Sequence, residues 1–598
     1  MGEQDALSPD IACYTDLDQS VAQFRTLTLL PGDWADPIQC RLNVHALPDP
    51  PQYRTISYAW GESSDIAQIT VNGVELTVPS SLERCLRHLR SPESAEENLW
   101  ADAVCINQSN IYEKAHQVSN MGVVYLKCSS MFIWLGELNP NHPSQDPFEM
   151  VRHWAEDKHF YQYPGFSISE DTGGWIFNDN PEYQRMYELF ADFTSRSWWS
   201  RLWIVQEIAL SPAATVILGS WQLPWATLLT ALANYYQHVG TCCAAASGVH
   251  PTKYTYDTDH LLFLSQQSDQ TTNIEYIVRA FRHKLCKNPR DKIYGLLGLL
   301  WKNRSIQIRP DYSLPVNRVY LDATKAIISQ SNGDLRFLTG LGFHSNSYQL
   351  PSWIRNFNIP LAAYEANHEH SRYRRYRLYC ASASTKGDIR VLDDNTLALT
   401  GTYIDRIERI STAITSRDWL RIRNVLKEWT DIANPLTTGQ TYDDVVQRDR
   451  YWRTVIADVV PTSIGSSNWN RVPTPTDSTI TACLADIAEH LRQGLEPPVS
   501  VAVQALWAAT CSRAFFRTES GHVGLCFPHS KIGDEIWVLA GGRVPFVLRP
   551  DRDPEKTTAD NTTAPRMRAL VGECYLHGYM DGEALRECNA GLVPVHLK

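Results

Sequence analysis

The chain has 598 residues, of which 43% are hydrophobic and 20% are charged, so its composition is that of folded globular domains rather than of a disordered chain. This length exceeds what one hydrophobic core usually supports, and we expect two or three packed units. Its 55 basic and 66 acidic residues leave a net charge of -11, which offers no overall attraction for nucleic acid or anionic lipid.

The beginning of the chain carries no recognisable signal for export. The segment Met1–Ser20 is acidic and lacks the basic start and apolar run of a signal peptide. No apolar stretch reaches the length that a membrane-spanning helix needs. We therefore expect a soluble cytoplasmic protein with no transmembrane segment and no nucleic-acid partner.

Strand and helix patterns alternate over residues 1–220, which predicts parallel strands joined by helices. Runs rich in β-branched and aromatic residues predict strands at 24–47 (two strands and a turn), 54–60, 68–78 (a hairpin around Asn72-Gly73), 98–106, 131–135 and 214–218. Apolar residues at helical spacing predict helices at 80–90, 111–128, 182–196 and 198–210. Residues 137–180 lack such periodicity and are predicted to form a long loop or insertion.

Beyond residue 220 the pattern becomes mainly helical and then rich in strands. Helices are predicted at 273–285, 318–329, 419–430, 442–459 and 479–495, with a strand-like run at 396–403. Short runs rich in Gly and aromatic residues at 514–582 predict a small barrel. The expected regions are an extension with short strands (1–52), an α/β domain (53–220), a mainly helical region (221–500) and a β-rich unit (501–598).

Three polar or thiol clusters suggest ligands but have simpler interpretations. The basic and aromatic run Arg372–Arg377 is expected to be a solvated strand or loop face rather than a phosphate site. The triplet His368–His370 shows no third ligand and is expected to lie in a solvated loop. The 14 cysteines lack CxxC spacing, and the pair Cys242-Cys243 resembles neither a zinc ribbon nor a zinc finger, so no metal site is expected.

Several segments, in a fixed order, resemble the signature of the fungal heterokaryon-incompatibility (HET) domain. They are Ile56–Gly61 (ISYAWG), Leu99–Gln108 (LWADAVCINQ), a helical segment with Glu113, Gln117 and Met121, Trp134–Gly136 (WLG), and Arg196–Glu207 (RSWWSRLWIVQE). Ala59 and Ala101 are mild departures from the usual residues. The segments Pro289–Gly298 (PRDKIYGLLG), Leu350–Trp353 and 533–583 resemble those that follow the domain in long HET proteins.

The resemblance implies a TIR-like α/β domain with a parallel sheet, followed by a mainly helical region and a small β-rich unit. It also implies an effector or regulator of fungal non-self recognition and programmed cell death, which associates with itself or with a protein partner of an incompatibility system. Two alternatives stay open: a TIR-like enzyme that cleaves NAD, and an accessory protein of a secondary-metabolite pathway. The resemblance establishes no cofactor, and NAD would enter only as a substrate.

The likeness of HET to TIR domains makes Glu207 the catalytic candidate, by analogy of fold. It lies on a predicted helix that adjoins the carboxyl ends of parallel strands, where open α/β sheets bind ligands. A carboxylate there could stabilise the oxocarbenium-like state in which nicotinamide leaves the ribose. The structural alternative is an ion pair between Glu207 and Arg201 or Arg196.

The two leading motif segments supply the candidate ligand-binding residues. These are Tyr58, Trp60, Gly61, Asp102, Asn107 and Gln108. Tyr58 and Trp60 could stack on a purine or nicotinamide ring, or could simply pack in the core. Asp102 interrupts an apolar run and therefore needs a hydrogen-bond partner or a chemical task, and capping the loop that follows is the alternative to catalysis.

Overall fold

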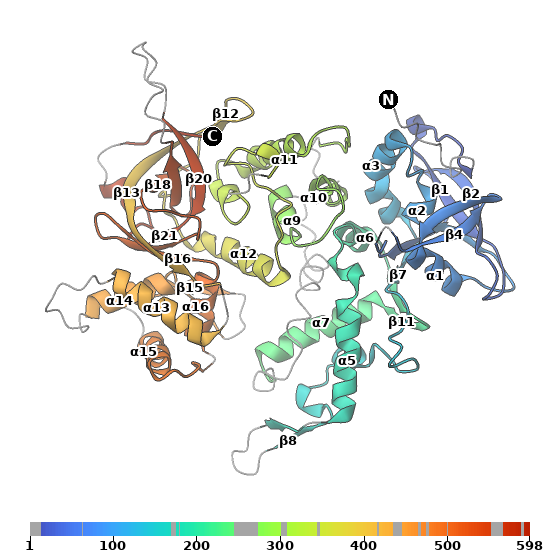
Figure 1. Cartoon of the computed structure of the whole chain (residues 1–598), viewed down its shortest axis with the longest axis horizontal. Helices are drawn as coiled ribbons and strands as arrows, with labels where there is room; N and C mark the ends of the chain where they lie inside the picture. Colours follow the sequence, from blue (N-terminus) through green and yellow to red (C-terminus); the bar gives the residue numbers. More distant parts are fainter. Residues whose placement is uncertain are drawn as a thin grey trace. The chain divides into compact units, whose positions relative to one another are not determined.

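The computed structural model describes residues 13–62, 64–168, 175–178, 180–243, 273–300, 308–343, 347–415, 418–433, 445–463, 468–473, 478–498, 500–551, 566–587 and 591–598 (Figure 1). The chain divides into two compact units, Met1–Pro315 and Val316–Lys598. No helix of the described residues is long and apolar enough to cross a membrane.

A nine-stranded sheet organises the first unit, in the order β11-β10-β7-β3-β6-β1-β2-β4-β5. Its strands are β1 (Gln23–Leu29), β2 (Gln39–Ala46), β3 (Arg54–Tyr58), β4 (Ile66–Val71), β5 (Val74–Pro79), β6 (Glu96–Trp100), β7 (Ser130–Trp134), β10 (Ala214–Leu218) and β11 (Trp221–Pro224). The predicted hairpin is confirmed, because Asn72 and Gly73 join β4 to β5 with positive φ angles of 53° and 82°.

Four neighbouring strands, β6, β3, β7 and β10, form a parallel core inside this sheet. Numbered one to four along the chain, they lie in the order 2-1-3-4, which is the order that flavodoxin-like doubly wound sheets share. In such sheets the strand order reverses between the first and third strands, here β3 and β7, and ligands bind at the carboxyl ends of those strands. The expected α/β unit with parallel strands is therefore present.

The helices of the first unit follow the predicted order. They are α1 (Ser80–Leu89), α2 (Asp102–Cys105), α3 (Ile111–Lys127), α4 (Glu149–Ala155), α5 (Pro181–Ser195), α6 (Ile204–Leu210), α7 (Trp225–Gly240), α9 (Ile274–Ala280) and α10 (Asp291–Tyr294), with 3-10 turns η3 (Phe160–Gln162), η4 (Ser197–Ser200) and η8 (Leu297–Leu300). Helix α3 packs against α6 and against η8. A small hairpin pairs β8 (Phe166–Ile168) with β9 (Trp175–Phe177).

Two local predictions for this unit are wrong. The apolar run 98–106 is not one strand: β6 ends at Trp100, and Asp102 begins α2 because its side chain accepts the Ala103 amide and ends the extended backbone. Residues 137–180 are not a long loop throughout, because they contain α4, whose side chains Met150, Val151 and Trp154 are buried. Helix α4 packs against α7, a contact that a local pattern does not reveal.

The second unit is built around a closed sheet. Pairing runs β18-β19-β20-β22-β13, and a further pairing of β13 with β18 closes these five strands into a ring, which β16, β17 and β21 extend. The strands are β12 (Arg390–Val391), β13 (Leu397–Ala413), β16 (Ala514–Thr518), β17 (Val523–Cys526), β18 (Glu535–Leu539), β19 (Phe546–Pro550), β20 (Met567–Glu573), β21 (Tyr575–Leu576) and β22 (Val593–Leu597). The predicted barrel-like β unit is confirmed, and its longest described strand, β13, lies outside the segment in which we expected it.

Helices and one small sheet complete the second unit. They are α11 (Val316–Ser331), α12 (Ala363–Arg375), α13 (Trp419–Ala433), α14 (Val445–Val455), α15 (Ser478–Gln493), α16 (Val501–Thr510) and α17 (Glu583–Glu587), 3-10 turns at Leu335–Leu338, Ser347–Gln349 and Tyr376–Leu378, and the pair β14 (Val459–Pro461) and β15 (Trp469–Arg471). The predicted helices at 318–329, 419–430 and 479–495 are confirmed.

The basic run and the histidine triplet are not solvated strands or loops. Both lie in α12 and the 3-10 turn after it, and Glu369 and His370 are buried. The Arg372 and Arg375 guanidiniums are also buried, and they donate to the backbone carbonyls of Cys511 at 2.7 Å and Ala508 at 2.8 Å. These carbonyls end α16, where helix carbonyls lack partners within the helix and attract cations.

Candidate functional site

The parallel strands bring the motif segments together at one edge of the first sheet. Tyr58 at the end of β3 lies opposite Trp134 at the end of β7, and Thr55 of β3 lies opposite Trp100 at the end of β6. Because these strands run in the same direction, the loops that follow them meet at their carboxyl ends. We call this edge of β3, β6 and β7 the switch-point edge.

Half-buried Asp102 is the centre of a hydrogen-bond network at the switch-point edge. Its carboxylate accepts hydrogen bonds from the Tyr58 hydroxyl at 2.7 Å and from the Trp60 indole N–H at 3.0 Å. It also accepts the backbone amide of Ala103 at 2.8 Å, and the Gln108 side chain donates to the Asp102 carbonyl at 2.9 Å. These donors compensate the carboxylate for the water that it loses, and the negative charge lies at the amino end of α2.

The other two candidate binding residues lie outside this network. Gly61 is exposed at the end of the motif, with a φ of 71°. The Asn107 amide donates to the Glu113 carboxylate at 2.8 Å, and Glu113 forms a buried ion pair with Arg25 at 2.6 Å. The structure therefore joins Tyr58, Trp60, Asp102 and Gln108, and it places Asn107 in a neighbouring ionic cluster.

The catalytic candidate Glu207 lies in the core, only 2% exposed. The Ser57 hydroxyl donates to its carboxylate, and the Trp198 indole N–H donates to the Ser57 oxygen at 2.7 Å. Ser57 and Tyr58 are consecutive residues of β3, so their side chains point to opposite faces of the sheet. Glu207 therefore lies on the face of the sheet opposite to the Tyr58 side chain.

Burial raises the pKa of Glu207 above the ordinary glutamate range. The Arg201 charge and the hydrogen bonds from Ser57 and Tyr125 oppose this rise, whereas the Asp102 charge adds to it. The expected ion pair is absent from the described residues, because Arg196 pairs with Asp192 and Arg201 donates to the Tyr58 carbonyl. A carboxyl with a raised pKa and no paired cation is what a general acid or a proton-dependent switch requires.

The PRDKIYGLLG segment (Pro289–Gly298), which follows the HET motif segments in the sequence, packs against them in the structure. The Asp291 carboxylate accepts the Trp203 indole N–H at 3.4 Å and the Tyr312 hydroxyl at 2.7 Å. Gly298 of η8 approaches Gly122 of α3 so closely that a Cβ on Gly122 would lie 2.9 Å from the Gly298 Cα. Only glycine fits this contact, which holds the PRDKIYGLLG segment against α3 and α6.

Sequence reasoning did not single out Ser57, Trp198 or Tyr125 as site residues, and it named Arg201 only as an ion-pair partner of Glu207. All but Tyr125 belong to motif segments, but their spacing of about 140 to 150 positions from their partners carries no local signal. The alternation of β3 could have assigned Ser57 and Tyr58 to opposite faces. It could not show which helix covers the Ser57 face.

Comparison with known proteins identifies two domains in this chain. Residues 53–207 match the family described as heterokaryon incompatibility protein (HET), and residues 498–590 match the Het-6 β-barrel domain. The chain is 24% identical to heterokaryon incompatibility protein 6, OR allele, of Neurospora crassa, over 95% of this chain and 95% of the relative. No solved structure matches the chain. After these matches, we call residues 53–207, which include the switch-point edge, the HET domain, and residues 498–590 of the second unit the Het-6 barrel.

Proposed function

We propose that this HET-domain protein is an incompatibility-type effector of fungal non-self recognition, and that its activation causes programmed cell death. The observation that supports this is the extent of the similarity to the Neurospora protein, which covers 95% of both chains and includes both domains. If the two proteins shared only the HET domain, the second unit of this chain would match nothing in the Neurospora protein. We expect the protein to act through self-association or through a protein partner of an incompatibility system.

We further propose that the HET domain is TIR-like. The parallel core has the 2-1-3-4 strand order, and the motif residues gather at the carboxyl ends of β3, β6 and β7, where such sheets bind ligands. The strands β1, β2, β4 and β5 are additions on one side of that core, and all their pairings except the parallel pairing of β2 with β4 are antiparallel. Strands β1 and β2 precede residue 53 in the chain and belong to the same sheet as the HET domain.

A second candidate function is cleavage of NAD by the HET domain, and the environment of Glu207 favours it. A desolvated carboxyl near the ribose could stabilise the oxocarbenium-like state as nicotinamide leaves. Glu207 is closed off by Ser57 and Trp198, so a substrate would reach it only after α6 or η4 moves. The half-buried Trp60 and the exposed Gly61 would then form the outer part of the ligand site.

The test is inducible expression of the full chain in fungal cells, with viability and NAD content followed together. Three chains are compared: the wild type, Glu207→Gln, and Glu137→Gln as a matched control, because Glu137 is an exposed glutamate of the same unit. Glutamine keeps an oxygen that can accept from Ser57, so Glu207→Gln removes the charge with little change of shape.

Each outcome separates the candidates. Death with loss of NAD in the wild type and the control, but not in Glu207→Gln, would support an enzymatic effector. Death with intact NAD in all three chains would support an effector that acts by assembly and would remove Glu207 from a catalytic role. Survival of cells that contain the folded wild-type chain, after fusion with a genetically incompatible strain, would contradict the effector proposal.

A further inference from the structure

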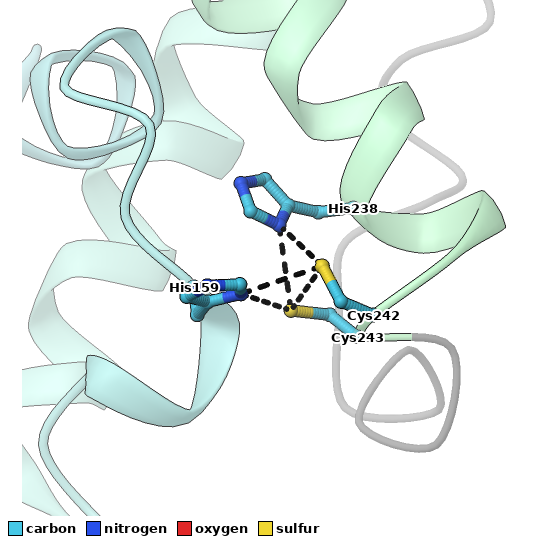
Figure 2. Close-up of side chains that lie close together, drawn as sticks. All are labelled: His159, His238, Cys242 and Cys243. Atoms are coloured by element: carbon cyan, nitrogen blue, oxygen red, sulfur yellow. Dashed lines mark hydrogen bonds between the residues drawn. The ribbon is translucent and has the colours of Figure 1, made fainter.

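Four metal-ligating side chains meet at the end of α7, away from the motif segments in sequence. They are His159, His238, Cys242 and Cys243, and their ligand atoms all lie within 4.8 Å of one another. Figure 2 shows the two imidazole rings and the two sulfur atoms directed toward one another, with His159 on the segment that follows α4 and the other three at the end of α7. The sequence hid this group because the cysteines are adjacent and one histidine is distant.

Five of the six distances between the ligand atoms lie within about 0.6 Å of the edges of one coordination tetrahedron, and all six are within 4.8 Å. The two sulfurs lie 3.9 Å apart, and Cys242 Sγ lies 3.0 Å from His238 Nδ1 and 3.4 Å from His159 Nδ1. Cys243 Sγ lies 3.4 Å from His159 Nδ1 and 3.6 Å from His238 Nδ1. Tetrahedral Zn²⁺, with bonds of about 2.3 Å to sulfur and 2.0–2.1 Å to nitrogen, would separate two sulfurs by roughly 3.8 Å and a sulfur from a nitrogen by roughly 3.6 Å.

The surroundings orient the ligands as metal sites require. The Asp157 carboxylate lies 3.1 Å from His238 Nε2, so it accepts that N–H and leaves the Nδ1 lone pair directed at the sulfurs. The Phe160 amide donates to Cys243 Sγ at 3.4 Å, and the Gln162 side chain accepts the His159 amide at 2.7 Å. His238 and Cys243 are buried, whereas Cys242 is exposed and offers a path for a metal ion to enter.

The backbone that presents the two thiols is itself fixed. Helix α7 ends in a turn in which the amides of Thr241 and Cys243 both donate to the His238 carbonyl, at 3.2 Å and 2.9 Å. The opposite wall is tied to α7 by the Asn234 side chain, which donates to the Trp154 carbonyl at 2.9 Å. Both walls of the cluster are therefore in place without rearrangement of the backbone.

We propose that His159, His238, Cys242 and Cys243 bind one structural Zn²⁺ ion, which ties the segment after α4 to the end of α7. A set of two thiolates and two imidazoles with tetrahedral spacing selects zinc among the common divalent metals. Four protein ligands leave no open position for a substrate, so the ion has a structural and not a catalytic role. The two thiolates balance the charge of the ion.

The test uses the full chain, purified in reducing buffer without chelators, with zinc measured by mass spectrometry of the elements. We expect about one zinc per chain in the wild type and in the control Cys286→Ser, a half-buried cysteine of the same unit outside the cluster. Cys242→Ser and His159→Gln are expected to lose the zinc, because each removes one of four ligands. Asp157→Asn keeps all ligands and should weaken zinc affinity by about 10–100-fold in a competition titration.

Two further measurements distinguish loss of a metal ligand from loss of the fold. Replacement of zinc by Co²⁺ in the wild type should give the strong tetrahedral and thiolate-to-metal absorption bands of a two-sulfur site. Glu207→Gln should keep its zinc, so the zinc site and the proposed function can fail separately. Three results would each overturn the proposal. They are a zinc content in Cys242→Ser equal to that of the wild type, Co²⁺ bound without thiolate bands, and a fully reduced wild type that binds no added Zn²⁺.

Discussion

Two glutamates, one in each unit, are almost equally buried but lie in opposite electrostatic environments. Glu207 of the HET domain is 2% exposed and Glu573 of the barrel is 1% exposed. Burial raises the pKa of Glu207, and no ion pair of the described residues includes it. Burial also acts to raise the pKa of Glu573, but the Arg513 charge and the hydrogen bonds from Tyr376 and Gly340 together lower it.

The difference separates a buried carboxylate that is paired with a cation from one that has no ion pair among the described residues. Glu573 is a fixed anion whose oxygens and neighbouring cation satisfy one another, and Arg513 lies also over the Phe527 ring at 4.0 Å. Glu207 accepts hydrogen bonds from Ser57 and Tyr125, but these do not offset the rise in its pKa that burial causes. The barrel therefore pairs its buried charge with a cation, whereas burial raises the pKa of the unpaired carboxyl in the HET domain.

The largest effect is expected from breaking the barrel pair. Arg513→Met would leave the Glu573 carboxylate buried without its cation, which typically costs about 3–5 kcal/mol of unfolding free energy. The change should appear as a lower denaturant midpoint for the second unit in urea or guanidinium unfolding. The double variant Arg513→Met, Glu573→Met should recover much of the loss, because it removes both charges.

An exposed pair in the same unit provides the control. Arg390 and Asp388 form an ion pair whose side chains are 69% and 59% exposed, and Asp388→Asn should leave the denaturant midpoint close to that of the wild type. A midpoint for Arg513→Met that matches that of Asp388→Asn would show that the buried pair does not stabilise the barrel. Glu573 would then have no demonstrated structural role to set against Glu207.

The second prediction concerns the hydrogen-bond chain at Glu207. Ser57→Ala removes the acceptor of the buried Trp198 N–H and the donor to Glu207, so we expect a loss of about 1–3 kcal/mol. Glu207→Gln should cost less, or should stabilise, because an amide oxygen still accepts from Ser57 and carries no charge into the core. Chemical unfolding of the two variants side by side measures the difference, and a larger loss for Glu207→Gln would mean that its charge is paired.

The third prediction uses pH, because the two pKa shifts have opposite signs. The lowered pKa of Glu573 gives stability that is present above the ordinary glutamate value of 4.5 and is lost as the pH falls through the folded-state pKa. The raised pKa of Glu207 gives stability that is present below 4.5 and is lost as the pH rises toward the folded-state pKa. Glu573→Gln should therefore flatten the acid limb of the stability curve, and Glu207→Gln should flatten the decline above 4.5. Unfolding free energies of the three chains across acidic to neutral pH check both signs.

The sequence was sufficient for elements whose signals are local. Alternating strand and helix patterns predicted the parallel core, and Asn72-Gly73 predicted its hairpin because only certain residues adopt the positive φ angles of that turn. The closed ring of the barrel was not predictable in detail, because β13 pairs with β18 and β22 from residues far away in the chain. The sequence also predicted that the basic run Arg372–Arg377 is exposed to solvent. Arg372 is buried instead, because it donates to a carbonyl 139 positions away, and a local pattern does not reveal such a partner.

The candidate site also has a part that local sequence signals predict and a part that depends on long-range contacts. The motif segments placed six residues in one candidate group, and the structure joins four of them, Tyr58, Trp60, Asp102 and Gln108, but not Gly61 or Asn107. The contact between Ser57 and Glu207 joins residues 150 positions apart, and only the packing of α6 on the sheet decides it. The same limitation hid the cluster of His159 with Cys242 and Cys243, whose ligand atoms come from two separate segments.

The smallest effect on stability is expected at the switch-point edge. Asp102→Asn keeps one oxygen that can accept from Tyr58 and Ala103, whereas the amide nitrogen would face the Trp60 N–H. Because Trp60 is only half-buried and can donate to water, we expect a loss of about 1 kcal/mol by thermal or chemical unfolding.

The same variant decides whether Asp102 has a structural role, like that of Glu573, or a functional role, like the one proposed for Glu207. If Asp102→Asn is stable but fails to kill cells, the edge serves recognition or chemistry, because a structural role would have cost stability first. If it kills cells as the wild type does, Asp102 only caps α2, and the functional half of the comparison depends on Glu207 alone. A loss as large as that of Ser57→Ala would instead make Asp102 a structural anion like Glu573.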